Sequence, residues 1–338
     1  MREDPGLDLA GITASLAEHY GLDVAAITYL PIGYDLDAAV YKILSTDGRS
    51  FFLKIRLGPV FEPGLEVPRR LIERGIPNIL GPLRSRSGAL WHPLDGYPGY
   101  TVVLYPFIRG ENAMKAGMSA AQWRKFGVTL RAVHDSGVGE QYRDRLRVED
   151  FALPSAALVR RMHTVAAEGT FPSPAAARFA VFWREQAARI DAMLTRAEAL
   201  GRELQAKLFD QVLCHSDIHA ANILVGDDGI TLIDWDGPML APRERDLLFV
   251  VGSRIARVVE PQEETWFFEG YGAVEIDPDA LVYYRYERIV EDLGEFGHSV
   301  FLAPDLGDEV RMGEAELAMS FFAPGKDIDR AETVVFHC

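Results

Sequence analysis

The stretch from Leu213 to Asp236 constrains this chain more than any other. It reads LCHSDIHAANILVGDDGITLIDWD, so that short apolar runs alternate with polar residues. An Asp-Gly turn between two β-branched runs is a hairpin signal. We therefore predict a loop that bears Asp217 and Asn222, followed by a hairpin that carries Asp234 back beside them.

Three oxygen-bearing side chains, those of Asp217, Asn222 and Asp234, are thus expected to converge with no thiol or basic group between them. Oxygen ligation with few protein donors suits Mg²⁺, which keeps several waters and takes further ligands from phosphates. A nearby carboxylate can orient a hydroxyl and accept its proton. The pattern His215-x-Asp217-x-x-x-x-Asn222, with Asp234 further on, has the spacing of the recurring parts of kinase chemistry. The alternative is that these residues only form turns, and the complete pattern disfavours it.

Length and composition indicate a folded protein of about two domains or lobes, with 338 residues. No apolar run is long enough to span a bilayer, and the acidic start of the chain is not typical of a signal peptide. The only cysteines are Cys214 and Cys338, in the catalytic stretch and at the last position. A structural disulfide is therefore not expected, and we assign the protein to the reducing cytoplasm.

The net charge is −15. Such an acidic balance argues against nucleic-acid binding, which requires a basic surface. An acidic surface would attract cationic small molecules. The same charge also serves simply to keep a protein soluble, which is the alternative.

The N-terminal part has the pattern of an antiparallel meander. Strands are predicted over residues 26–31, 38–45, 50–57, 89–91 and 100–107, with a helix at 7–20 and another from about 64 to 74. Lys54 lies within the third strand, and a lysine on a mostly buried strand needs a partner. Glu66 in the second helix is the candidate, with Glu62 and Glu73 as competitors. An edge-strand lysine that points to solvent is equally compatible with the pattern.

The remaining chain is mostly helical. Helices are predicted over residues 119–136, 173–207, 247–251, 263–271 and 277–296. Five strands and a helix followed by helices and one hairpin predict an α+β fold of two lobes. We place the nucleotide-binding lobe at residues 1–108 and the catalytic and substrate-binding lobe at residues 109–338. The P-loop pattern and the Gly-x-Gly-x-x-Gly pattern are both absent.

At these residues the chain resembles the aminoglycoside phosphotransferase and choline kinase superfamily. The resemblance is carried by Cys214–Leu224 and Ile233–Asp236, and it covers nearly the whole chain. Within the superfamily, Ile233–Leu247, Tyr105–Ile108 and Tyr283–Asp292 are most similar to the spectinomycin phosphotransferases. The resemblance implies a protein-kinase-like fold, with an antiparallel sheet and a helix in the N-lobe and a mostly helical C-lobe. It also implies ATP-dependent O-phosphorylation of a cationic aminocyclitol or aminoglycoside, and spectinomycin is the first candidate acceptor.

The resemblance implies a role for each site residue. Asp217 would be the catalytic base, and Asn222 and Asp234 would hold Mg²⁺. Lys54, paired with Glu66, would hold the phosphates of ATP. The other residues expected to bind the nucleotide are Gly33, Tyr105, Phe107 and Ile108. His215 would brace the catalytic loop.

A small-molecule acceptor is expected because the short spacing between Asp234 and Asp246, with no Ala-Pro-Glu after it, lacks the peptide platform of protein kinases. For a cationic acceptor the pocket should be acidic and aromatic. The residues expected to contact the acceptor are Trp235, Asp236, Tyr284, Glu287 and Glu291. Asp236 is also a candidate second metal contact. The alternative is that the tyrosines are core residues and the carboxylates form a solvated face.

Other functions remain compatible with the sequence. One is a kinase of another small-molecule alcohol, choline-like or sugar-like. A second is a metal-dependent phosphohydrolase with His215, Asp217 and His219 as ligands. A third is a non-catalytic nucleotide-binding scaffold. We expect no nucleic-acid or membrane partner, and a monomer.

Overall fold

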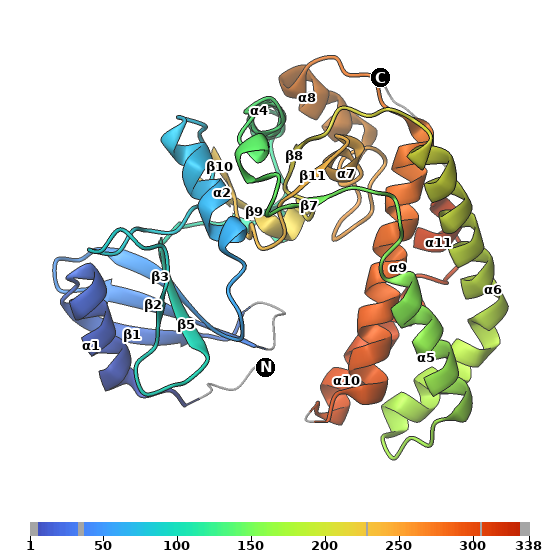
Figure 1. Cartoon of the computed structure of the whole chain (residues 1–338), viewed down its shortest axis with the longest axis horizontal. Coiled ribbons are helices and arrows are strands. Elements are labelled where there is room, and N and C mark those ends of the chain that lie inside the picture. Colours follow the sequence, from blue (N-terminus) through green and yellow to red (C-terminus); the bar gives the residue numbers. More distant parts are fainter. Residues whose placement is uncertain (1–5, 33–36, 228, 305, 332–338) are drawn as a thin grey trace. The chain divides into compact units, whose positions relative to one another are not determined.

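The computed structural model of the chain describes residues 6–32, 37–227, 229–304 and 306–331. It has the expected α+β class and divides into two compact units (Figure 1). Unit 1 comprises Met1–Arg147, Val212–Leu240 and Trp266–Gly272, and unit 2 comprises Val148–Gln211, Ala241–Thr265 and Ala273–Cys338. Unit 1 extends past residue 108 and includes residues 212–240, which contact residues 111–142. The division into lobes at residue 108 stays a prediction.

Unit 1 is built on a five-stranded antiparallel sheet of strand order β1-β2-β3-β5-β4 (Figure 1). The strands are β1 (Val24–Leu30), β2 (Ala38–Ser45), β3 (Ser50–Leu57), β4 (His92–Pro93) and β5 (Tyr100–Pro106). Lys54 pairs with Val40 of β2 on one side and with Val103 of β5 on the other. Lys54 therefore lies on the central strand, and the edge-strand alternative is excluded.

The two faces of this sheet have different partners, because alternate side chains of a strand point to opposite faces. Leu53 and Ile55 of β3 join one buried core with residues of α1 (Leu9–Tyr20). On the other face, Val103 packs with Leu65 of α2 (Glu62–Glu73). By this alternation Lys54 lies on the face that α2 covers.

The predicted hairpin is confirmed. Strand β9 (Ile223–Gly226) pairs antiparallel with β10 (Gly229–Leu232), and β6 (Glu111–Asn112) adds an unpredicted third strand against β9. The other elements of this part of the chain are α3 (Ala113–Ala116), α4 (Ala120–His134), η1 (Gly139–Tyr142), β7 (Arg147–Val148), β8 (Val212–Cys214), η2 (Ala220–Asn222) and β11 (Met239–Ala241). Strands β7, β11 and β8 form a small sheet in that order.

Unit 2 is helical, and its long helices α5, α6, α9 and α10 pack together (Figure 1). Its helices are α5 (Ala156–Glu168), α6 (Pro174–Gln205), α7 (Glu244–Leu247), α9 (Pro278–Leu302), α10 (Asp308–Ser320) and α11 (Asp327–Arg330). Helix α8 (Pro261–Tyr271) begins in unit 2 and ends in unit 1. Helix α6 starts as the sequence predicts, because the Ser173 side chain accepts a hydrogen bond from the amide of Ala176 and Pro174 occupies the first turn.

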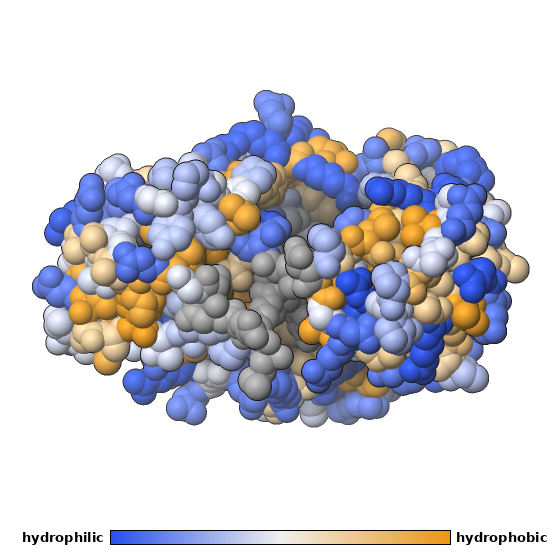
Figure 2. Space-filling model, turned by 90° about the horizontal axis from the view of Figure 1, so that it is seen from below, coloured by the Kyte–Doolittle hydropathy of each residue, from blue (hydrophilic) through white to orange (hydrophobic). Residues whose placement is uncertain are grey.

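Hydrophilic residues cover much of the face shown in Figure 2, with apolar patches between them. None of the helices within the described ranges combines the length and the apolar character that a membrane crossing requires.

Candidate active site

The loop after β8 is fixed by His215. Its Nε2 lies 2.9 Å from the carbonyl oxygen of Ile233, and its Nδ1 lies 3.3 Å from the amide nitrogen of Asp217. With Nδ1 as the acceptor, Nε2 is the protonated nitrogen that donates to Ile233. His215 therefore ties the loop that bears Asp217 to the strand end that precedes Asp234, as the brace expected from the sequence.

Asn222 connects the same parts from the other side. Its Nδ2 donates to the carbonyl oxygen of Asp217 at 2.8 Å and lies 3.2 Å from the Asp217 Oδ2. Its own carbonyl oxygen accepts a hydrogen bond from the amide of Ile233 at 3.0 Å. Because the amide nitrogen is used as a donor, the amide oxygen is the atom that can ligate a metal.

The backbone is strained at two positions of the candidate site, one in the loop after β8 and one just after β10. Ser216 has a φ of 73° and Asp234 a φ of 64°, both in the left-handed region. Such conformations cost about 1–3 kcal/mol each and concentrate at functional sites. At Ser216 a side-chain hydrogen bond to the carbonyl oxygen of Gly237, at 2.6 Å, helps to hold the turn.

The electrostatics of the site are those of an acidic cluster with one lysine. The Lys54 Nζ lies 2.6 Å from Asp236 and 3.7 Å from Asp234. Burial raises the pKa of Asp234, and the neighbouring charges of Asp236 and Asp217 raise it further, whereas Lys54 and His215 act in the opposite direction. Carboxylates that repel one another in this way, beside an amide oxygen, fit a divalent oxygen-seeking cation such as Mg²⁺.

The residues expected to bind the nucleotide are only partly described. Tyr105 lies one residue before the end of β5. Burial raises the pKa of its phenol, and the charges of Asp236 and Asp234 add to the effect. Phe107 follows β5, with its amide nitrogen 3.3 Å from the Ser50 carbonyl oxygen. Ile108 is half-buried next to it. Gly33 lies outside the described residues. The nucleotide-binding roles of these residues stay predictions.

Residues 28–281 match the profile of the phosphotransferase enzyme family, which is well over half of the chain. The chain belongs to this family. The crystal structure of a spectinomycin phosphotransferase, APH(9)-Ia, in complex with ADP and spectinomycin is 31% identical to it, with a TM-score of 0.86 over 97% of this chain and 98% of that one. This match confirms the protein-kinase-like fold and places the chain among small-molecule phosphotransferases.

Two further relatives of this phosphotransferase are more distant. The protein StrN of Streptomyces griseus is 28% identical over 192 residues, which are 55% of this chain and only 58% of StrN. The amicoumacin kinase hAmiN, in complex with AMP-PNP, Ca²⁺ and Ami, is 18% identical with a TM-score of 0.63, over 96% of this chain and 97% of that one. That likeness concerns the fold alone.

One expected contact of the phosphotransferase differs in the structure. Glu66 was expected to pair with Lys54, but its carboxylate lies 2.7 Å from the guanidinium of Arg145. The competing candidates have arginine partners as well: Glu62 lies 3.0 Å from Arg145, and Glu73 lies 2.8 Å from Arg84. Lys54 instead pairs with the carboxylate of Asp236, 2.6 Å away.

The two acceptor candidates that follow Asp234 differ in exposure. Trp235 is 3% exposed, and its ring lies against His215 with the centroids 4.5 Å apart. Trp235 therefore packs against His215, and its expected acceptor contact stays a prediction. Asp236 is half-exposed but forms the ion pair with Lys54, so its expected acceptor or metal contact remains a prediction.

The acceptor contacts expected on α9 stay predictions, and two of these residues have partners within the protein. Tyr284 and Glu287 are 0% and 2% exposed. Glu287 forms a buried ion pair with Arg245, whose guanidinium lies 5.6 Å from the centre of the Tyr284 ring. Burial lowers the pKa of Arg245, but the charges of Glu287 and Glu291 outweigh it and raise the pKa. Tyr284 and Glu287 thus hold an internal arginine; half-buried Glu291 remains a candidate.

Asp292 on the same helix gives a testable pH dependence. Burial raises its pKa to about 6, and the charge of Glu291 contributes, whereas its partner Arg288, 3.1 Å away, opposes the shift. Because the folded pKa is raised, protonated Asp292 favours the folded state, and this stabilisation is lost as the pH rises from 4 through 6. We therefore expect the difference in unfolding free energy, Asp292→Asn minus wild type, to increase by about 1–3 kcal/mol between pH 4 and pH 8.

Urea unfolding at several pH values measures this difference. Asp210→Asn, at an exposed position after α6, controls for the loss of an aspartate charge. A difference between Asp292→Asn and the wild type that stays constant over this pH range would contradict the assignment.

Gly64 of α2 is a close contact that the sequence analysis missed. A Cβ at this position would lie 2.9 Å from the carbonyl oxygen of Trp235 and 3.5 Å from the Cα of Asp236. The first turn of α2 therefore touches the backbone that bears the metal and lysine partners. The only signal in the sequence was a glycine in a helix start, which many other roles would explain equally well.

We expect Gly64→Ala to lower kcat/KM by about 10–100-fold, because displacement of the Asp234–Asp236 backbone misplaces the reacting groups. Steady-state kinetics with thermal unfolding will measure the effect. The matched control is Gly313→Ala in α10, where a Cβ would meet no atom within 4 Å. Equal activities of the two variants would exclude a role for this contact.

Proposed function

We propose that this phosphotransferase transfers the γ-phosphoryl group of ATP to a hydroxyl of a cationic aminocyclitol or aminoglycoside, with spectinomycin as the first candidate. The observation that carries the proposal is the similarity, over 97% of the chain, to a spectinomycin phosphotransferase whose crystal structure holds ADP and spectinomycin. The acidic composition supports a cationic acceptor.

In this proposal Asp217 accepts the proton of the acceptor hydroxyl. The hydroxyl oxygen forms a bond to the γ-phosphorus as the bond to the bridging oxygen breaks, and ADP leaves. Asn222 and Asp234 would hold Mg²⁺, which neutralises developing charge on the phosphates. Lys54 would bind phosphate oxygens, which are negatively charged like the carboxylate oxygens of its present partner Asp236. His215 keeps Asp217 and Asp234 in register through its main-chain hydrogen bonds.

A metal-dependent phosphohydrolase is disfavoured by the arrangement of the histidines. Both ring nitrogens of His215 lie at hydrogen-bond distance from main-chain atoms, so His215 has no lone pair to offer a metal without losing its brace. The Nδ1 of His219 likewise accepts a hydrogen bond from the amide of Ala221 at 3.2 Å. Lys54 would also lack a function in hydrolysis.

An ADP-release assay over a panel of acceptors tests the proposal. The panel holds spectinomycin, several aminoglycosides, choline and simple sugars, each with ATP and Mg²⁺. We expect spectinomycin to give the highest kcat/KM and a product heavier by one phosphoryl group. Preference for choline or a sugar would replace the acceptor class, and ATP turnover that no acceptor raises above background would overturn the proposed activity. We further propose that the enzyme acts in the cytoplasm as a monomer, which gel filtration with light scattering tests.

A further inference from the structure

One short segment of unit 1, residues 136–145, forms several contacts with the polar face of α2. Arg145 donates to Glu66 at 2.7 and 3.3 Å and to Glu62 at 3.0 Å. Arg70 donates to the Gln141 side chain at 3.2 Å. These contacts span successive turns of the helix, and all of them come from the chain that follows α4.

A fourth contact completes this attachment at the C-terminal end of the helix. Arg74, the C-cap of α2, donates to the carbonyl oxygen of Ser136 at 2.8 Å. The segment therefore holds the helix from its first turn to its last residue.

Arg145 is the residue of this segment best suited to hold a helix in place. Its planar guanidinium bridges two carboxylates that lie one helical turn apart, which an ammonium group does not match. It also lies 5.9 Å from the centre of the Tyr142 ring. The side chains of Arg145, Glu62 and Glu66 are 43%, 50% and 31% exposed. A single pair at such exposure contributes little, but a network restrains geometry.

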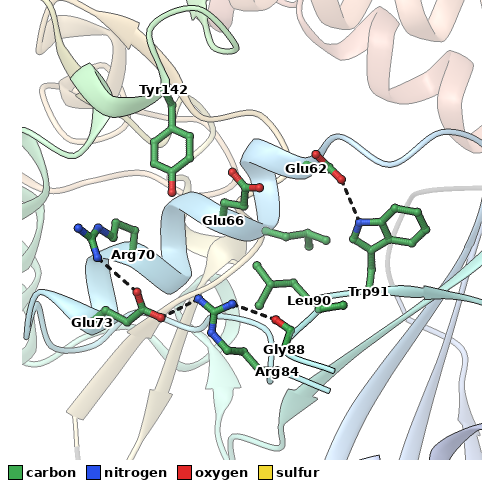
Figure 3. A pocket seen from close by; sticks show the side chains of 11 residues that line it. Glu62, Glu66, Arg70, Glu73, Arg84, Gly88, Leu90, Trp91 and Tyr142 are labelled. Atoms are coloured by element: carbon green, nitrogen blue, oxygen red, sulfur yellow. Dashed lines mark hydrogen bonds and ion pairs between the residues drawn. The ribbon is translucent and has the colours of Figure 1, made fainter. Parts of the chain in front are cut away.

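Figure 3 shows the surroundings of these glutamates. A cavity of about 440 Å³ lies beside α2, and Glu62, Glu66 and Tyr142 are among its lining residues. At its edge the indole nitrogen of Trp91 lies 3.4 Å from Glu62. Burial raises the pKa of Tyr142, and the charge of Glu66 adds to this effect. Glu66 thus belongs to a polar cluster on the side of α2 that faces Arg145 and Tyr142.

We propose that Arg145 is a positioning residue of the reaction. Arg145, rather than Lys54, is the partner of Glu66. By holding the first turns of α2, Arg145 keeps Gly64 against the backbone of Trp235 and Asp236. Lys54 is then the partner of the carboxylates of Asp234 and Asp236, and it would bind the phosphates of the nucleotide when ATP is present. This inference rests on the proposed kinase activity, but it reassigns the ion pair on which the position of α2 depends.

Two double-mutant cycles test the assignment, one with Glu66→Gln and Arg145→Gln and one with Glu66→Gln and Lys54→Met. The readouts are the Kd for ATP·Mg²⁺ by calorimetry and kcat and KM at saturating acceptor. We expect each variant of the first pair to lower kcat/KM for ATP by about tenfold, and the double variant to be no worse than either. In the second cycle the effects should multiply. The charge-exchanged variant with Glu66→Arg and Arg145→Glu should recover part of the loss, which a purely local packing defect would not.

Arg143→Gln is the matched control, because Arg143 lies in the same segment and forms an exposed ion pair with Glu140. It should leave the kinetic constants unchanged. Coupling of Glu66 to Lys54 but not to Arg145 would overturn the inference. A wild-type protein that neither binds ATP·Mg²⁺ nor turns it over would instead refute the proposed function, so the two failures are distinguishable.

Discussion

Asp217→Ala should lower kcat by about 10²–10⁴-fold while the Kd for ATP·Mg²⁺ changes little. The reason is that the carboxylate is proposed to touch the acceptor hydroxyl. Its loop is held by contacts that do not need its side chain: the Asp217 amide bonds to His215 and its carbonyl oxygen accepts from Asn222. Single-turnover kinetics with calorimetry separates the two quantities.

The control for this variant is Asp227→Ala, in the exposed turn of the same hairpin. It should retain wild-type turnover. If Asp217→Ala turned over within a few-fold of the wild type, the base would have to be sought elsewhere. A parallel loss of ATP·Mg²⁺ affinity would mean that Asp217 serves the metal rather than the hydroxyl.

Asp234→Asn should abolish most Mg²⁺-dependent turnover, by about 10²-fold or more, yet leave the nucleotide-free protein as stable as the wild type. Its pKa is raised in the folded state by burial and by Asp236. A raised carboxyl pKa means that ionisation opposes folding as the pH rises through that value, so a neutral amide removes a cost at neutral pH. Turnover should therefore fall without a loss of stability.

Thermal unfolding measured with and without ATP and Mg²⁺ checks this expectation. The wild type should be stabilised by the pair of ligands, and Asp234→Asn should lose that stabilisation without a fall in its own melting temperature. Asp236→Asn is the informative comparison, because this carboxylate lies 2.6 Å from Lys54 and is only a candidate for a second metal contact. Retained Mg²⁺-dependent stabilisation in Asp234→Asn would remove Asp234 from the metal site.

The hairpin that brings these residues together could be predicted because its information is local. Asp217, Asn222 and Asp234 are separated by one loop and one hairpin, and turn residues between two β-branched runs indicate that hairpin from the sequence alone. Strands β2 and β3 likewise begin and end at the predicted residues, since turn residues bound their alternating patterns. These features need no knowledge of distant contacts.

The partners of charged residues could not be predicted because they depend on long-range contacts. Glu66 and Arg145 are far apart in the sequence, and Arg145 stands in a run of charged residues that gives no sign of a specific partner. Tyr284 and Glu287 read as a binding face, yet α9 buries them around Arg245. Amphipathic spacing shows that one face of a helix makes contacts, but it does not show whether that face contacts a ligand or another part of the protein.

Some elements were missed for a related reason. Strand β4 was predicted at residues 89–91 and occupies His92–Pro93, where its pairing with β5 rather than its own composition defines it. Helices α5 and α10 were not predicted. Neither helix has a side-chain hydrogen bond at its N-cap: Ser155 precedes α5 without capping it, and Gly307 precedes α10.

The central claim is that Asn222 and Asp234 hold a magnesium-bound nucleotide against a hydroxyl that Asp217 orients. A crystal structure with a non-hydrolysable ATP analogue, Mg²⁺ and spectinomycin tests it most directly. We predict oxygen atoms of Asn222 and Asp234 at about 2.0–2.1 Å from the metal, and an Asp217 oxygen within hydrogen-bond distance of one acceptor hydroxyl. A triphosphate and metal bound away from these residues would contradict the account.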